Sequence, residues 1–221
     1  TEGTVSPASL TFTTADWSSA QTVTATGVND AIPDGDQLYS IVTASASSSD
    51  PGYDGLDPAD VLLANTDDDT AGITVNPVSG LVTTEGGGTA SFTVVLNTQP
   101  FASVTIGVSS SDTTEGTVNP ATLTFTPANW NSAQTVTATG IDDAVADGNQ
   151  PYSIVTAAAS SGDPGYHGLN PADVSMTNTD DDASGISMIP VTGLVTTESG
   201  GTAGFTVVLN TQTTANVTIG L

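Results

Sequence analysis

The chain repeats its own sequence with a period of 113 residues. Residues 1–108 align with residues 114–221 without a gap, and only 30 of the 108 aligned positions differ. A period of this length is too long for one unit of a solenoid and matches one whole domain per repeat. The repeat therefore predicts a tandem array of similar domains.

The domain boundaries are expected just after two runs of three aspartates. Asp67–Asp69 and Asp180–Asp182 are each followed within a few residues by Gly-Ile, which begins a new block. On this division residues 70–182 are one complete repeat, residues 1–69 are the last part of a preceding repeat, and residues 183–221 are the first part of a following one. Residues 183–221 are therefore expected to complete residues 1–69 of an adjoining copy. Separate chains joined head to tail and one continuous longer polypeptide would both give this arrangement.

Alternating apolar and polar residues predict β-strands in the complete repeat. This period of two marks half-buried strands, and its apolar positions are Ala90, Phe92, Val94, Leu96, Val104, Ile106, Val108, Leu123, Phe125, Val136 and Ala138. Further strands are expected near 73–76, 151–158 and 173–179, and no stretch shows a sustained helical period. About seven strands in about 110 residues predict an all-β fold of tandem immunoglobulin-like antiparallel β-sandwiches.

The charge of the chain excludes several classes of function. It has 24 Asp and Glu, one His, no Cys, and no Lys or Arg. Without cationic side chains it cannot neutralise a nucleic-acid backbone or hold an anionic membrane surface, and no segment is long and apolar enough to span a membrane. A nucleophile, a base and an oxyanion hole cannot be assembled convincingly from this inventory, so we expect no enzymatic activity. The carboxylates must be solvated, screened by salt or bound to metal cations.

Carboxylates gather in three places that fall in predicted loops. These are the triplet Asp180–Asp182, the loop from Gly140 to Asp147, and Glu85 together with Asp112. Three adjacent aspartates repel one another, and Ca²⁺ takes six to eight oxygen ligands, mostly carboxylates and carbonyls, from flexible loops. The clusters therefore predict bound calcium. The alternative is that these aspartates only make turns, which Asp and Asn favour through local hydrogen bonds.

The order of these motifs resembles the Calx-beta domain family. It runs from Val-Thr-Thr-Glu85 through Thr114-Glu-Gly-Thr and Gly140-Ile-Asp-Asp to the closing triplet. The family is a seven-stranded sandwich found in sodium–calcium exchangers, an integrin subunit and very large bacterial surface proteins, with calcium sites at one end. The resemblance implies that the ligands here are Glu85, Asp112, Asp142, Asp143, Asp147, Asp180, Asp181 and Asp182. The acidic loop has fewer carboxylates than in the exchangers, and Asp112 lies closer to its Thr-Glu-Gly-Thr segment, so fewer calcium ions per domain than the family's full cluster are expected.

The partial copies carry the matching positions. Those in residues 1–69 are Asn29, Asp30, Asp34, Asp67, Asp68 and Asp69, and Glu198 matches Glu85. All keep their charge except Asn29, which can still offer a carbonyl oxygen. By contrast, the loop from Asp163 to Asp173 loses carboxylates between copies, since Asp54 is replaced by His167. We therefore expect this loop to be solvated and His167 to lie on the surface.

These observations favour an extracellular or cell-surface structural protein. The expected function is a calcium-binding repeat that forms a rod or a head-to-tail filament, with other copies of the chain as partners. An alternative is an adhesin module that binds a glycan or another cell-surface ligand. The near-identity of the copies favours the structural repeat over the adhesin module, because a specific binding face usually needs one distinctive module. An intracellular calcium sensor fits least well.

Overall fold

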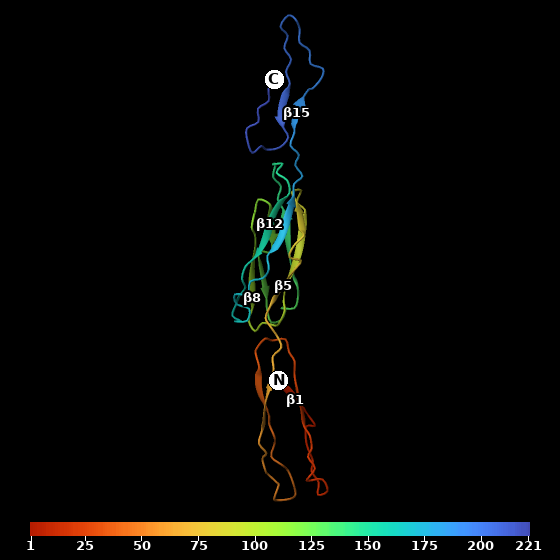
Figure 1. The fold of residues 1–221 in the computed structure, drawn as a ribbon, viewed down its shortest axis with the longest axis vertical. Coiled ribbons are helices and arrows are strands. Elements are labelled where there is room, and N and C mark those ends of the chain that lie inside the picture. The colour runs from red at the N-terminus through yellow and green to blue at the C-terminus, as the bar shows by residue number, and fades with distance from the viewer.

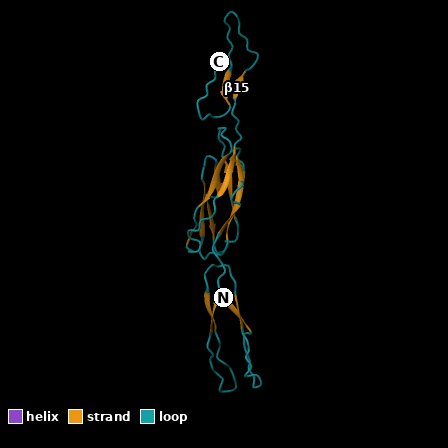
Figure 2. Ribbon diagram, in the orientation of Figure 1, coloured by secondary structure: helices purple, strands orange, loops and turns teal.

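In a computed structural model that describes residues 1–221, the chain forms a narrow rod in which three segments follow one another (Figure 1). We name them the N-terminal segment (1–69), the central segment (70–182) and the C-terminal segment (183–221). All regular structure is β-strand (Figure 2), which confirms the all-β fold class. No helix of the length and hydrophobicity needed to cross a membrane is present.

The central segment is a sandwich of two sheets. The smaller sheet has the order β5-β7-β11-β9, and the larger has the order β10-β8-β12-β14-β6, with β13 paired beside β8. The strands are β5 (Ile73–Asn76), β6 (Leu81–Thr84), β7 (Thr89–Leu96), β8 (Val104–Ser110), β9 (Gly116–Asn119), β10 (Thr122–Phe125), β11 (Gln134–Gly140), β12 (Gln150–Thr156), β13 (Ser160–Ser161) and β14 (Val174–Thr179). All pairs are antiparallel except β6 with β14, which is parallel.

The sandwich has more strands than the alternating pattern predicted. Two extended stretches are each broken by a proline, Pro77 after β5 and Pro120 after β9. Because proline has no N–H to donate, it ends the ladder. The chain then crosses to the other sheet, where β6 and β10 begin. The alternating pattern does not predict β6, β9 or the two-residue β13.

The hydrophobic core lies entirely within the central segment. Its sixteen buried side chains run from Phe92 to Met176 and come from both sheets. The inward positions predicted by alternation are confirmed: those in β7, β8, β10 and β11 are buried, apart from the half-buried Ala90. Trp130 packs against the rim of this core.

The two outer segments form only fragments of the same fold. The N-terminal segment has two separate hairpin-like pairs, β1 (Gly3–Ser6) with β2 (Thr24–Gly27) and β3 (Gln37–Ile41) with β4 (Val61–Asn65). The C-terminal segment has one pair, β15 (Ile186–Ile189) with β16 (Thr206–Leu209). Neither segment contains a buried residue.

Candidate metal centre

Carboxylates converge at the end of the central sandwich that adjoins the C-terminal segment. Three groups of three side chains place their oxygen atoms within 4.8 Å of one another. The groups are Glu85–Asp142–Asp181, Glu85–Asp180–Asp182 and Glu115–Asp143–Asp147. We call these eight residues the acidic cluster. The structure thus brings together every carboxylate carried over from the family resemblance except Asp112.

Glu85 is the buried member that connects two of the groups. It follows β6, which lies parallel to β14, and its N–H donates to the carbonyl of Thr179 at 3.0 Å. Its side chain is only 3% exposed. The end of β6, just before Glu85, lies so close to β11 that a Cβ on Gly140 would collide with the carbonyl of Thr84. Glycine at position 140 therefore allows β6 to seat Glu85 in the cluster.

Backbone N–H groups hold the aspartate triplet in place. Asp180 accepts from the N–H of Gly148 at 2.6 Å and from that of Asp182 at 2.7 Å. The N–H of Asp181 donates to the Glu85 carboxylate at 3.2 Å. Oδ2 of Asp182 is buried and has no hydrogen-bond partner. A buried carboxylate oxygen without a partner is costly, and its position among other carboxylates is what a cation ligand requires.

Burial and the mutual repulsion of the carboxylates both raise pKa values in the acidic cluster. Burial, together with the charges of Asp180, Asp143 and Asp181, raises the pKa of Glu85. Burial and the charges of its triplet neighbours raise the pKa of Asp182. The N–H groups of Asp182 and Gly148 lower the pKa of Asp180, which keeps that carboxylate ionised. With no Lys or Arg in the chain, only an external cation can neutralise the cluster.

Glu115 joins the cluster although sequence reasoning did not assign it as a ligand. It lies just before β9 and is 9% exposed, and burial raises the pKa of its carboxyl group. Asn178 on β14 donates to its carboxylate at 3.4 Å and to the carbonyl of Ile141 at 3.0 Å. Glu115 belongs to the Thr-Glu-Gly-Thr segment, and its match Glu2 keeps the charge. The presence of a carboxylate at this position in both copies could have identified Glu115 from the sequence.

Asp112 and the Asp163 loop differ from the expectations. Asp112 is exposed, and its carboxylate accepts from the N–H and hydroxyl of Thr114, which lowers the pKa of Asp112. It therefore forms a local turn outside the acidic cluster. The loop expected to be solvated is partly buried: Asp163 accepts from the N–H of Phe101 at 3.0 Å and is 3% exposed. The expectation failed because this carboxylate satisfies backbone groups inside the fold, whereas His167 is exposed as predicted.

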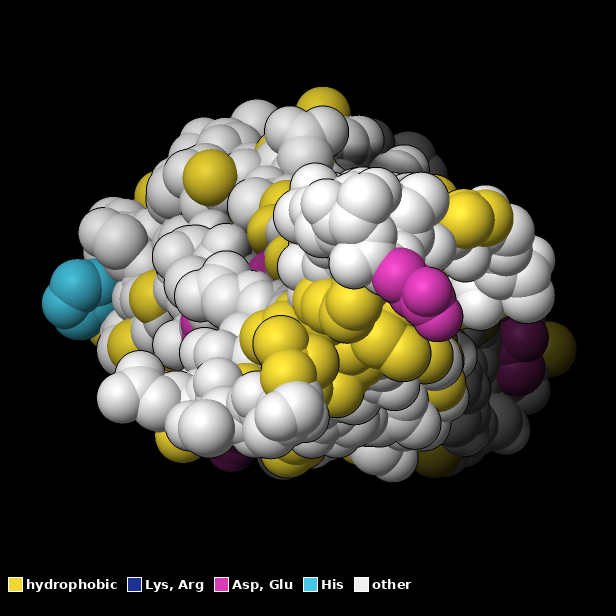
Figure 3. Space-filling view, turned by 90° about the horizontal axis from the view of Figure 1, so that it is seen from above, with side chains coloured by type: hydrophobic (Ala, Val, Ile, Leu, Met, Phe, Trp, Pro, Cys, Tyr) yellow, Lys and Arg dark blue, Asp and Glu magenta, His cyan; other side chains and the backbone are white.

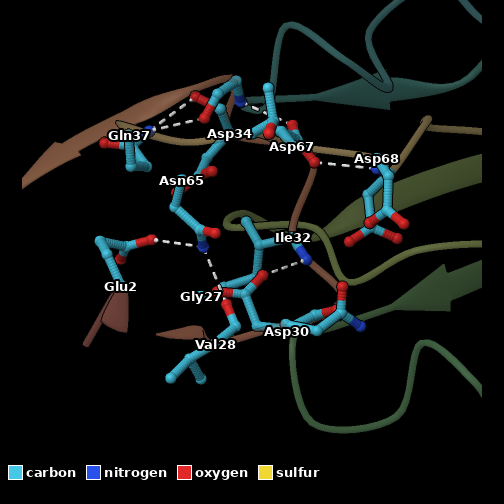
Figure 4. Close-up of a pocket in the computed structure, with 14 residues that line it drawn as sticks. Glu2, Gly27, Val28, Asp30, Ile32, Asp34, Gln37, Asn65, Asp67 and Asp68 are labelled. Atoms are coloured by element: carbon cyan, nitrogen blue, oxygen red, sulfur yellow. Dashed lines mark hydrogen bonds between the residues drawn. The ribbon is translucent and has the colours of Figure 1, made fainter. Parts of the chain in front are cut away.

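The N-terminal segment carries an incomplete version of the same site. The N–H groups of Gly35 and Asp69 donate to Asp67, and Asn65 contacts Glu2, as their counterparts do in the central segment. These residues, with Asp30, Asp34 and Asp68, line an open hollow of about 320 Å³ (Figure 4). Nothing in this segment corresponds to Glu85, whose match Glu198 lies in the C-terminal segment.

The acidic loops also form the contacts between neighbouring segments. The N–H of Gln99 donates to the carbonyl of Ala31 at 2.7 Å, and the N–H of Gln212 donates to the carbonyl of Ala144 at 2.6 Å. The donor and the acceptor of the second bond each lie 113 residues after those of the first, so the two junctions are equivalent. A short parallel bridge between Val145 and Gln212 strengthens the second junction.

Comparison with known proteins gives similarity at low identity. No protein-family model and no curated protein sequence matches the chain. Among solved structures, it is similar to the apo form of the Calx CBD1 domain (18% identity, TM-score 0.39), covering 50% of this chain and 96% of that one. It is also similar to domains 4 and 5 of the S-layer protein SbsC (17% identity, TM-score 0.34), covering 73% and 84%. The periplasmic chaperone SfaE matches at 11% identity and TM-score 0.38, over 50% of this chain and 58% of the chaperone.

Proposed function

We propose that this chain is a calcium-binding structural repeat, similar to Calx-beta domains, that forms a stiff rod at a cell surface or outside the cell. The observation that carries the proposal is the acidic cluster, in which the buried Glu85 and the unpartnered Oδ2 of Asp182 face other carboxylates in a chain without Lys or Arg. The order of sequence motifs and the β-sandwich support the family resemblance.

The donor set fits a hard divalent cation. Carboxylates from three separate elements converge within ligand-sharing distance: Glu85 from the turn after β6, Asp142 from the acidic loop, and Asp181 from the triplet. Oxygen-only ligands in loops suit calcium, which accepts six to eight donors in flexible geometry. Bound calcium would offset the burial and the mutual repulsion that raise the pKa of Glu85 and Asp182.

The position of the cluster connects calcium to the stiffness of the rod. The acidic loop that supplies Asp142, Asp143 and Asp147 also accepts the Gln212 N–H from the next segment through Ala144. Only three residues separate Asp182 from β15, so no flexible linker intervenes. A cation that orders the acidic loop should therefore also restrain the angle between neighbouring segments. We propose this structural role in place of catalysis.

Calcium titration and small-angle scattering of the full chain test this proposal. We expect saturable calcium binding by calorimetry, and a longest dimension that becomes less variable when calcium is added and more variable with a chelator. The double variant Glu85→Gln/Asp182→Asn should lose the central site while the core remains folded. Absence of calcium binding by the unaltered chain would contradict the proposal.

A matched control removes one carboxylate elsewhere. Asp57 is exposed, takes part in no hydrogen bond, and already corresponds to Asn170 in the other copy. The variant Asp57→Asn should bind calcium as the unaltered chain does. If it weakened binding as much as the double variant, the effect would reflect net charge and not a site.

A further inference from the structure

A buried chain of hydrogen bonds runs from the core of the central sandwich to Glu115 in the acidic cluster. The hydroxyl of Tyr152 lies 3.0 Å from that of Thr83, and the Thr83 hydroxyl donates to Oδ1 of Asn178 at 3.0 Å. Nδ2 of Asn178 donates to the Glu115 carboxylate at 3.4 Å and to the carbonyl of Ile141 at 3.0 Å. Thr83 and Asn178 are both buried, so these groups satisfy one another inside the fold.

The partners fix the direction of this hydrogen-bond chain. The ionised carboxylate of Glu115 and the carbonyl of Ile141 offer only acceptors, so the amide of Asn178 must turn its NH₂ group toward them. Its oxygen then faces Thr83, which donates to it, and Tyr152 donates to the hydroxyl of Thr83. Every donor therefore points toward the acidic cluster, and each bond polarises the next.

Two glycines of the sequence motifs make room for this chain. A Cβ on Gly116, the residue after Glu115, would collide with the ring of Tyr152. A Cβ on Gly140 would lie 2.5 Å from Oδ1 of Asn178. The Thr-Glu-Gly-Thr and Gly-Ile-Asp-Asp motifs thus supply both carboxylates of the cluster and the space that its buried donors need.

The same amide contact forms in the N-terminal segment without the rest of the chain. Asn65 donates to the Glu2 carboxylate at 3.4 Å and to the carbonyl of Val28 at 2.9 Å (Figure 4). The match of Thr83 is Thr196, which lies in the C-terminal segment, and the N-terminal segment has no buried residue. The bond between amide and glutamate therefore does not depend on packing of the core.

Uncharged donors hold Glu115 because the chain offers no cation for that role. The view along the rod (Figure 3) shows carboxylates and the single histidine at the surface, and the sequence holds no Lys or Arg. Asn178 ties Glu115 to the acidic loop that carries Asp143 and Asp147, the other two members of its ligand group. The N–H of Ile141 donates to the carbonyl of Glu115 at 3.0 Å and joins the same two elements.

We propose that Asn178 is a positioning residue that holds Glu115 and the start of the acidic loop in ligand geometry before a cation binds. The inference rests on the proposed calcium function and assigns a role to a side chain that is not itself a ligand. Ligands that are already held in place lose less conformational freedom on binding, which raises affinity.

Calcium titration of the full chain tests the proposal with Asn178→Ala. This variant keeps every carboxylate but should weaken binding at the central site by about tenfold or more, as is typical of residues that orient metal ligands. Tyr166→Phe is the matched control, because its buried hydroxyl bonds to Thr98, past the opposite end of β7 from Glu85. It should bind calcium as the unaltered chain does. An equal loss in both variants would show that reduced stability is the cause and would overturn the proposal.

A double variant shows whether Asn178 acts through Glu115. If it does, adding Asn178→Ala to Glu115→Gln should weaken binding by less than the product of the two separate losses. Losses that multiply in full would overturn the proposal, as would calcium binding by Asn178→Ala as tight as that of the unaltered chain.

Hydrogen exchange without calcium tests the positioning separately from the proposed function. Asn178→Ala should speed amide exchange in residues 141–147, because the acidic loop loses the donor that holds its Ile141 carbonyl. Tyr166→Phe should leave exchange in these residues unchanged. Equal exchange in the unaltered chain and Asn178→Ala would overturn the positioning role, whereas absence of calcium binding by the unaltered chain would contradict the proposed function.

Discussion

The central and N-terminal segments carry almost the same sequence from residue 114 and from residue 1, yet only the central one has a core. Tyr166 is fully buried and Tyr53 is 61% exposed, although both lie in the motif Asp-Pro-Gly-Tyr. The difference lies in what precedes them in the chain. The central copy has β5 to β8 to pair with, and the N-terminal copy does not. Strands of this kind are stable only when neighbouring strands bury their apolar faces.

The largest contrast is expected for a core phenylalanine. Phe92→Ala should destabilise the central segment by about 3–5 kcal/mol, because it leaves a cavity among fully buried side chains. The matched Phe205→Ala should leave the unfolding transition of the central segment unchanged, since Phe205 is half exposed. Urea unfolding followed by tryptophan fluorescence of Trp130 would measure both. Equal losses would show that the two copies are packed alike.

A smaller contrast is expected for the two tyrosines. The Tyr166 hydroxyl donates to the carbonyl of Thr98 at 2.6 Å and accepts from its N–H at 3.1 Å, in a buried position. Tyr166→Phe should cost about 1–3 kcal/mol, because it leaves both backbone groups without a partner. Tyr53→Phe should leave the unfolding free energy of the central segment unchanged. Thermal unfolding of the two variants side by side gives the comparison.

The acidic clusters should differ in calcium affinity. Glu85→Gln should weaken binding at the central site by on the order of tenfold or more, because it removes the carboxylate shared by two ligand groups. Glu198→Gln should leave that site unaffected, because Glu198 lies in the C-terminal segment and belongs to none of the central ligand groups. Without calcium, Glu85→Gln should not destabilise the fold, since a neutral side chain relieves the repulsion at this buried position. Calorimetry and thermal unfolding, each with and without chelator, would separate these effects.

The smallest expected effect is the response of the calcium-free chain to pH. Glu85, Glu115 and Asp182 have raised pKa values in the folded state, so the fold binds their protons more tightly than the unfolded chain does. The stability they contribute is therefore present below the ordinary values, 4.5 for Glu and 3.8 for Asp, and is lost as the pH rises through the raised values. The pKa of Asp180 is lowered, so its contribution to stability has the opposite pH dependence. That contribution is present above 3.8 and is lost only as the pH falls below this value.

The calcium-free central segment should accordingly melt at a higher temperature in mild acid than at neutral pH. Added calcium should reverse this trend, because it binds the ionised carboxylates. The variant Glu115→Gln should reduce the gain in acid, since it removes one of the three groups. A calcium-free melting temperature that falls steadily on mild acidification would contradict the expectation.

Much of the candidate site could be inferred from the sequence because its residues come in short local motifs. The triplet Asp180–Asp182 and the acidic loop with Asp142 are visible as runs of carboxylates in turn-forming positions. Glu115 was missed because it stands alone in the sequence and is brought to the cluster by pairing of β9 with β11. Asp112 was included from a family pattern, but its side chain instead closes a turn with Thr114.

The sequence by itself determined the inward faces of β7, β8, β10 and β11 in the central segment, because an alternation of apolar and polar residues is a local property of the chain. It also determined the repeat, the excess of carboxylates and the segments in which they gather. Only the tertiary structure decided which copies are packed. Leu81–Thr84 forms a strand beside β14, whereas the identical residues 194–197 form none, because β pairing and burial depend on partners distant in the sequence.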